Sequence, residues 1–180
     1  MTQVVFTHRA LHKKEASLVS KKLRETPYIT GYMPDELVCL DNSNIAEVDG
    51  RFAGVCITKD ISSRWSEIAM MYVLPEFRNQ GIGTTLFDQA FQSIRYKKRH
   101  LYCVSRNKSV IKLLHSQGFV FRSRIWQLPL PVILHIIRFS LNFYRVKEFV
   151  RKLFAFQKQD PFVYALLPYS KPVVRETADR

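Results

Sequence analysis

Glycine and proline are scarce in this chain, with 6 and 8 among 180 residues. Collagen-like and low-complexity chains need far more of both, so these classes are excluded. Apolar runs are short too: the charge-free stretch from Ile125 to Ile137 falls below the roughly 18–20 residues that cross a bilayer. The first residues, MTQVVFTHRALHKKE, reach charged side chains before any apolar run of signal-peptide length. We therefore expect neither a membrane span nor export.

Cysteine is also rare, and its three positions, Cys39, Cys56 and Cys103, form no C-x-x-C pair. An odd number scattered through apolar contexts predicts reduced core residues of a cytoplasmic protein rather than a disulfide framework. His8 and His12 are four residues apart, but they lack the glutamate of an H-E-x-x-H motif and are interpreted as surface histidines. No metal site is expected.

Acidic residues are few: the chain has 15 Asp and Glu against 28 Lys and Arg, which gives a net charge of +13. Such a surface attracts polyanions in general, whether nucleic acid, anionic lipid or a phosphorylated cofactor, and charge alone does not choose among them. With 47% hydrophobic residues, the chain can bury an ordinary core. We expect a single domain over residues 1–180.

The hydrophobic pattern predicts strands first, followed by alternating helices and strands. Asp49-Gly50 between two apolar runs is typical of a β-hairpin, and the continuous apolar run of Glu67–Val73 is typical of a central strand. Further strands are predicted at Val4–Phe6, Ile45–Val48, Phe52–Thr58, Leu101–Ser105, Val120–Gln127 and Phe162–Leu167, and helices at Lys13–Glu25, near Pro34-Asp35, at Thr84–Tyr96 and at Asn107–Gln117. This order indicates an α/β or α+β sandwich.

Residues 128–159 interrupt that order with one or two predicted helices. Polar residues recur there at three- and four-residue steps and leave a very wide apolar face: His135, Arg138, Asn142, Arg145, Glu148 and Lys152. Three roles stay open: a lid whose aromatic side chains line an acceptor pocket (Phe139, Phe143, Tyr144, Phe149, Phe154 and Phe156), a dimer surface, or an interfacial membrane helix with a basic polar side. A wide apolar face favours the lid or the dimer surface, because it more often means burial against protein.

The segment EIAMMYVLPEFRNQGIGTTLFDQAF joins an apolar strand to a helix through a loop with Arg78 and two glycines, Gly81 and Gly83. Successive main-chain N–H groups and the positive end of a helix make such a loop a cradle for anions such as phosphate. The spacing fits neither a nucleoside-triphosphate loop nor a dinucleotide fingerprint. A pair of glycines that serves a turn alone is the other interpretation.

Two segments resemble signatures of the GNAT N-acetyltransferases. Val73–Gly83 resembles the acetyl-CoA signature V-x-P-x-x-R/Q-x-x-G-x-G/A, and Asn107–Phe119 resembles the N-x-x-A-x-x-L-Y-x-x-x-G-F segment. Both occur in the family's order on the expected strand–helix–strand–helix frame. The resemblance covers Val4–Gln127 and the last strand, and it leaves out residues 128–159.

The resemblance implies an α/β (α+β) fold with a mixed, mostly antiparallel sheet flanked by helices, and an extra helical insertion before the last strand. The sheet would splay after Glu67–Val73, and acetyl-CoA would lie in the splay with its pantetheine paired to backbone near Met71 and Val73. Its pyrophosphate would rest on the loop made of Arg78, Asn79, Gln80, Gly81, Ile82, Gly83 and Thr84. Asn107 would face the cofactor or act simply as a helix N-cap.

Chemistry on a thioester needs an uncharged amine, so a base must take a proton from the ammonium form. Glu67 is the candidate, because histone-acetyltransferase-type GNATs place a glutamate base at this spacing from the loop. A main-chain N–H near Met71 would stabilise the charge that develops on the carbonyl oxygen. The family's tyrosine acid is replaced by Leu114, which leaves Tyr72, Tyr102, Tyr164 or solvent to protonate the thiolate.

Two functions remain open at this point. One is an acetyl-CoA-dependent N-acetyltransferase that moves acetyl directly to a primary amine, whose identity the sequence does not give. The other is a GNAT-like regulatory module that binds an acyl-CoA or nucleic acid without turnover. A homodimer is possible, nucleic acid is the less favoured partner, and peripheral membrane contact is possible but not favoured.

Overall fold

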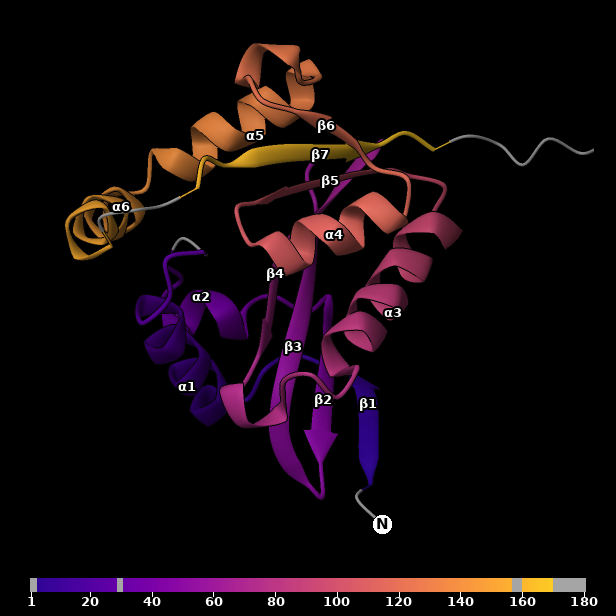
Figure 1. Cartoon of the computed structure of the whole chain (residues 1–180), viewed down its shortest axis with the longest axis vertical. Coiled ribbons are helices and arrows are strands. Elements are labelled where there is room, and N and C mark those ends of the chain that lie inside the picture. Colours follow the sequence, from indigo (N-terminus) through magenta and orange to yellow (C-terminus); the bar gives the residue numbers. More distant parts are fainter. Residues whose placement is uncertain (1–2, 29–30, 157–159, 170–180) are drawn as a thin grey trace, which may run out of the picture.

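A computed structural model describes residues 3–28, 31–156 and 160–169. Seven strands form one sheet in the order β1-β2-β3-β4-β5-β7-β6 (Figure 1). The strands are β1 (Val4–His8), β2 (Ser43–Val48), β3 (Arg51–Asp60), β4 (Trp65–Val73), β5 (His100–Ser105), β6 (Val120–Arg122) and β7 (Val163–Leu167). The α-helices are α1 (Lys13–Arg24), α2 (Pro34–Val38), α3 (Ile82–Tyr96), α4 (Lys108–Ser116), α5 (Leu130–Ser140) and α6 (Phe143–Ala155), with short 3₁₀ turns at Pro75–Phe77 and Ile125–Gln127.

The sheet consists of two parts that meet at one short contact. β4 and β5 are parallel, and they pair only where Trp65–Glu67 faces His100–Tyr102. All other neighbours in the sheet are antiparallel. Beyond Glu67 the two strands diverge, so that β5 and β7 cross the view while β3 and β4 run along it (Figure 1). The mixed, mostly antiparallel and splayed sheet is therefore confirmed.

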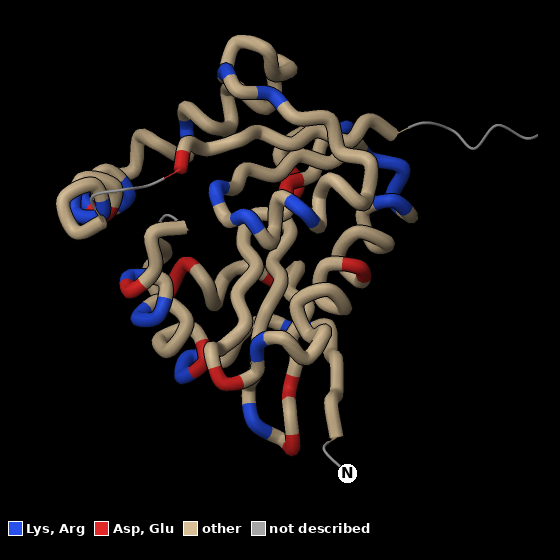
Figure 2. The backbone as a smooth tube through the Cα atoms, viewed as in Figure 1, with Lys and Arg blue, Asp and Glu red and all other residues tan. Residues whose placement is uncertain are grey.

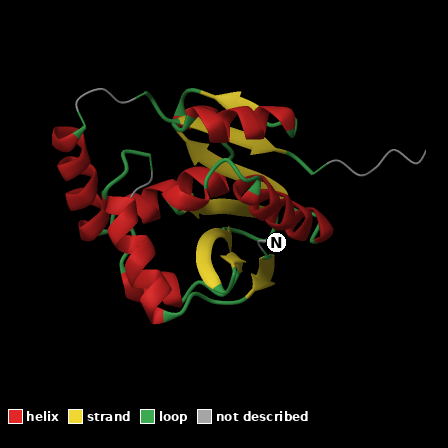
Figure 3. Ribbon diagram, turned by 60° about the horizontal axis from the view of Figure 1, so that its bottom comes forward, coloured by secondary structure: helices red, strands yellow, loops and turns green. Residues whose placement is uncertain are grey.

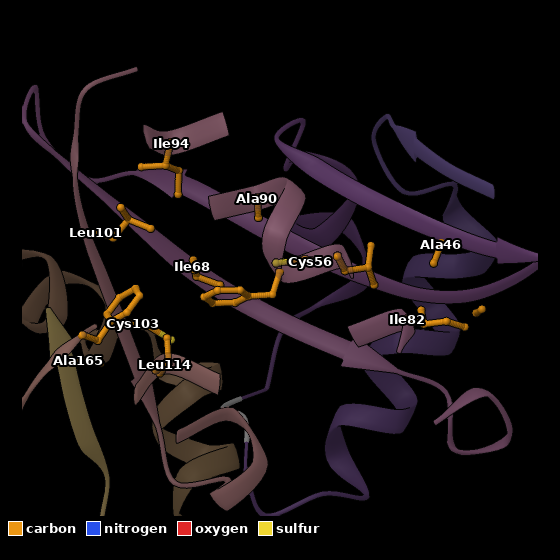
Figure 4. Close-up of a cluster of buried hydrophobic side chains, with 14 of the residues drawn as sticks. Ala46, Cys56, Ile68, Ile82, Ala90, Ile94, Leu101, Cys103, Leu114 and Ala165 are labelled. Atoms are coloured by element: carbon orange, nitrogen blue, oxygen red, sulfur yellow. The ribbon is translucent and has the colours of Figure 1, made fainter. Parts of the chain in front are cut away.

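Helices cover both faces of the sheet (Figure 3). Neighbouring residues of a strand point to opposite faces, and the two apolar clusters divide accordingly. On one face, α3 packs on β2, β3 and β4 through Ala46, Cys56, Ile68, Ile82, Leu86, Ala90 and Ile94 (Figure 4). On the other, α1 and α2 pack through Ala16, Val19, Leu23 and Leu37 onto Ile45, Val55, Ile57 and Met70. The two layers hold β4 rigidly in the centre of the molecule.

Three expectations need correction. The predicted strand Val120–Gln127 ends at Arg122, because β6 is an edge strand that pairs with β7 alone and the chain then forms a 3₁₀ turn. The helix expected from Thr84 begins at Ile82, since Gly81 takes a left-handed φ of 78° and ends the loop. Cys39 is exposed just after α2, whereas Cys56 and Cys103 are buried as expected.

Helix α6 docks with its polar side inward, which reverses the expectation that its wide apolar face is the buried one. Arg145, Glu148 and Lys152 are buried, while the opposite apolar side is exposed. Lys152 Nζ donates to the Leu23 carbonyl at 2.6 Å and Arg151 Nη2 to the Arg24 carbonyl at 2.8 Å. These carbonyls belong to the last turn of α1, the negative end of the helix, where cations are favoured; the Leu23 carbonyl also accepts from the Thr26 N–H at 3.3 Å. The basic stripe of α6 therefore caps α1.

The burial of Lys152 predicts how stability depends on pH. Burial lowers the pKa of Lys152 to about 8, with a further lowering from Arg151, Arg106 and Arg24 that Glu148 opposes. The unfolded chain keeps this proton up to the ordinary pKa of 10.5, so between these values the unfolded state binds more protons. The contribution of this group to the free energy of unfolding therefore rises with pH over that window.

Urea unfolding of the wild type and of Lys152→Met, at about pH 7.5 and about pH 9, checks this sign. We expect the wild type to gain stability relative to the variant at the higher pH, since the variant has no proton to lose. If the difference in the free energy of unfolding between the two proteins is the same at both pH values, burial does not lower the pKa of Lys152.

Candidate active site

A cavity of about 870 Å³ occupies the space where β4 and β5 diverge. Its walls come from segments that are far apart in the sequence: residues 67–73 of β4, the loop before α3, residues 102–105 of β5 and the start of α4. Helix α5 closes one side with His135, Ile136, Phe139 and Ser140. The open splay of the sheet is thus a single cleft that reaches from the loop to the α5–α6 insertion.

The backbone of β4 presents an unused edge to this cavity. The Leu74 N–H donates to the Ala53 carbonyl of β3 at 2.9 Å, so the peptide groups of Leu74 and Tyr72 face β3. Peptide groups alternate along a strand, and those of Met71 and Val73 therefore face the cavity. Arg78 Nε donates to the Val73 carbonyl at 3.0 Å and occupies that one acceptor. An extended ligand could add to this edge as a further strand.

The loop before α3 carries a row of main-chain N–H groups that point away from internal partners. Within the described part of the chain, the N–H groups of residues 79–84 donate no hydrogen bond. The Arg78 N–H donates to the Pro75 carbonyl at 3.3 Å, so the usable row starts at Asn79. These groups lie at the positive end of a 15-residue helix, which favours an anion. The loop therefore offers several main-chain donors to an anion at one place.

The glycines leave the space above the loop open. A Cβ built on Gly81 meets nothing within 4 Å, and one on Gly83 meets only the Val73 side chain at 3.6 Å. Neither glycine is therefore required by the protein's own packing, although the φ of 78° at Gly81 does favour glycine. Of the other loop residues, Ile82 is buried in the core, and the exposed Gln80 donates from Nε2 to the Glu76 carbonyl.

Asn107 caps α4 and also lines the cavity. Its Oδ1 accepts from the Ser109 N–H at 2.9 Å, as an N-cap residue does. Its Nδ2 donates to nothing within the described ranges, so the capping role leaves that group available to a ligand. The two roles considered for Asn107 are compatible.

Glu67 lies at the last position where β4 pairs with β5, at the apex of the splay. The carboxylate is buried, lines the cavity and accepts no bond from its own sheet; its Oε2 lies 2.8 Å from His135 Nε2. His135 comes from α5, which is 68 residues further along the chain. A carboxylate and an imidazole in contact at the inner end of a cleft are the arrangement that proton transfer requires.

Comparison with known proteins agrees with this geometry. Residues 13–119 match the acetyltransferase (GNAT) family. The chain belongs to the GNAT family. A curated relative, an uncharacterized N-acetyltransferase from Archaeoglobus fulgidus, is 34% identical over 79 residues, which cover 41% of this chain and 48% of that protein. The chain thus matches about half the length of this relative.

Solved structures show the same fold at low sequence identity. N-acetylglutamate synthase from Neisseria gonorrhoeae, complexed with coenzyme A and N-acetyl-glutamate, has a TM-score of 0.66 at 16% identity; the match covers 92% of this chain and 35% of that one. YncA from Salmonella typhimurium, with its cofactor acetyl-CoA, has a TM-score of 0.62 at 14% identity and matches 98% of this chain and 99% of its own. These likenesses establish the GNAT fold.

The GNAT match ends at residue 119, before the α5–α6 insertion. His135 therefore reaches the cleft from outside the matched region. In the sequence, His135 belongs to a polar stripe, and nothing there predicts a role for it in the site. Its spacing of three residues from Arg138 and seven from Asn142 gave no indication that α5 would lie across the end of the cleft.

Leu114, which stands where the family has its tyrosine, is fully buried in the core and has no proton to donate. Other tyrosines do line the cavity: Tyr28, Tyr32, Tyr72, Tyr102 and Tyr164. Burial raises the pKa of Tyr32, Tyr72 and Tyr102, so these hydroxyls stay protonated at neutral pH. The raised pKa also makes each of these three hydroxyls a weaker acid than an ordinary tyrosine.

The aromatic side chains of the insertion, for which a lid was one interpretation, divide between the cavity and the outside. Phe139 and Phe149 line the cavity. Phe143 and Phe154 are 83% and 82% exposed and lie away from it. The insertion thus contributes a wall through one side and turns another apolar side outward.

Proposed function

We propose that this GNAT domain transfers the acetyl group of acetyl-CoA to a primary amine inside the cavity between β4 and β5. The observation that carries the proposal is the row of unused N–H groups at residues 79–84, which opens into the same cavity as the unused edge of β4. Relatives of this fold hold coenzyme A or acetyl-CoA. A diphosphate on the loop would leave the pantetheine arm to pair with Met71 and the N–H of Val73.

In this mechanism Glu67 takes the proton from the acceptor ammonium, directly or through water. The amine then attacks the thioester carbonyl, and the Met71 N–H, which faces the cavity, stabilises the developing oxyanion. The C–S bond breaks and one of the cavity tyrosines protonates the thiolate, while the nitrogen loses its second proton to that tyrosine, directly or through water, as the amide forms. His135 holds the Glu67 carboxylate in place and acts as a positioning residue.

The test is release of free thiol from acetyl-CoA across a panel of small amines, peptides with free N-termini and lysine peptides. We expect turnover with at least one class that exceeds the background of Glu67→Gln. If acetyl-CoA raises the melting temperature but no amine gives turnover, the result would instead support a regulatory binding module. If the module binds nucleic acid instead, its affinity for nucleic acid should fall steeply as the salt concentration rises.

Replacement of His135 should slow transfer without weakening acetyl-CoA binding. For His135→Ala we expect kcat to fall about tenfold, because the Glu67 carboxylate loses the contact at 2.8 Å that holds it in place. The KM for acetyl-CoA should not change, and His135→Gln, which can still donate to Glu67, should restore part of kcat.

His115→Ala is the matched control, since His115 is exposed on α4 and does not line the cavity. Its kinetics should equal those of the wild type. If His135→Gln restores none of the kcat that His135→Ala loses, His135 has a packing role alone.

A further inference from the structure

Helices α5 and α6 carry an apolar surface that no described residue covers. It consists of Leu130, Leu134, Ile137 and Leu141 at α5 and Phe143, Val146, Val150, Leu153 and Phe154 on α6, which we call the outer face. Exposure of these side chains runs from 44% at Val150 to 83% at Phe143. Exposed apolar side chains of this number in adjacent helices mark an interaction surface rather than ordinary solvent-facing positions.

Helical geometry gathers these residues into one stripe on each helix. At about 100° per residue, the α6 members fall within roughly 100° of one another and the α5 members within roughly 60°. The buried polar residues of α6, such as Glu148 and Lys152, lie on the opposite side. The orientation of α6 is fixed by contacts with α1, including the Lys152 bond to the Leu23 carbonyl and the contact of Arg24 with Glu148 at 3.4 Å. The outer face is thus held outward by the fold.

The border of the outer face is basic. Residues 122–156 contain seven Lys and Arg and one acidic residue, Glu148, which is buried beside Arg151 and Arg24. Arg122, Arg124, Arg138 and Lys147 are exposed, and blue positions outnumber red ones along this part of the tube (Figure 2). Trp126, beside Arg124, is also 69% exposed. Apolar side chains bordered by cations are complementary to a surface that is anionic above and apolar beneath.

We propose that the outer face docks on the surface of an anionic lipid bilayer. Aliphatic and aromatic side chains would enter the boundary between headgroups and acyl chains, while the arginines and Lys147 contact the phosphates. None of the helices in the described ranges combines the length and apolarity that a bilayer crossing requires, so the contact lies along the surface.

Charge argues against a second copy of this chain as the occupant. Two outer faces brought together would place their exposed cations, Arg138 and Lys147 among them, near each other with no exposed acidic residue in 122–156 to pair with them. Nucleic acid would satisfy the cations but would leave the leucines and phenylalanines of the face in water. An anionic lipid surface can pair with the exposed cations and also remove the apolar side chains of the outer face from water.

The experiment measures sedimentation of the full chain with phosphatidylcholine vesicles and with vesicles that also contain phosphatidylglycerol. We expect binding to the anionic vesicles at least tenfold tighter than to the neutral ones. The triple variant Leu134→Gln, Leu141→Gln, Phe154→Gln should lose at least tenfold in affinity, and Arg138→Gln with Lys147→Gln should lose the preference for anionic lipid.

Tyr96→Gln is the matched control, because Tyr96 is 89% exposed at the end of α3 and belongs to another surface. It should bind like the wild type, and all variants should keep the wild-type melting temperature. Equal binding of the triple variant and the wild type would overturn the proposal. The proposal would also be overturned, in favour of a second copy, if the wild type is a stable dimer that does not bind vesicles and the triple variant is a monomer.

Discussion

Glu67→Gln should reduce kcat for acetyl transfer by about 10²- to 10⁴-fold, the range typical of the loss of a general base. Glutamine keeps the volume of the side chain and can still bond to His135, but it cannot accept the ammonium proton. The melting-temperature rise caused by acetyl-CoA should be unchanged, because the carboxylate lies at the apex of the splay while the N–H row lies at its loop end. Steady-state thiol release and thermal unfolding measure the two effects separately.

Asp88→Asn serves as the control for loss of one carboxylate. Asp88 is on α3, outside the wall of the cavity, and forms no ion pair within the described residues. Its kcat should match the wild type. If Glu67→Gln keeps kcat within a factor of two, the base is another group or water, and the assignment of Glu67 is wrong.

Gly81→Glu should abolish binding of acetyl-CoA, with a loss of at least about 100-fold in affinity. At [L] near 100 Kd a ligand stabilises by about 2.7 kcal/mol, and this stabilisation should vanish in the variant. The glutamate would place a carboxylate beside the N–H row at residues 79–84, where it would satisfy those donors itself and repel phosphate. Differential scanning fluorimetry with increasing acetyl-CoA measures the loss.

The control is Gly50→Glu, in the turn between β2 and β3. Gly50 has a φ of 73°, close to the 78° of Gly81, and a Cβ there likewise meets nothing within 4 Å. Both variants carry the same charge change and a similar cost of about 1 kcal/mol for a left-handed side chain. Only Gly81→Glu should lose the ligand-dependent rise, and an equal loss in Gly50→Glu would show that strain, not the cradle, is responsible.

The sequence was sufficient for the features that depend on local pattern. The Asp49-Gly50 turn, the apolar run that became β4 and the glycine loop before α3 each have a signature within a few residues, because turn geometry and helix starts are local properties. The splay between β4 and β5 was implied by the GNAT resemblance rather than by pattern. Strand periodicity does not tell where two parallel strands stop pairing.

Tertiary contacts decided the features that the sequence did not predict. The polar stripe of α6 has the spacing of a solvated face, yet Lys152 and Arg151 donate hydrogen bonds to carbonyls at the end of α1. Periodicity within α6 does not indicate a contact with another helix. In the sequence, His135 and Arg138 belong to the same polar stripe, and nothing distinguishes one from the other. His135 meets Glu67 because α5 lies across the cleft, and such contacts between distant segments are set by packing.

The central claim is that the N–H groups of residues 79–84 bind the diphosphate of coenzyme A. Amide chemical shifts of ¹⁵N-labelled protein during titration with coenzyme A test it at those atoms. We expect saturable shifts at residues 79–84, together with Met71 and Val73 on the edge of β4. Saturable binding that leaves those amides unshifted, or a spectrum that coenzyme A does not change, would contradict it.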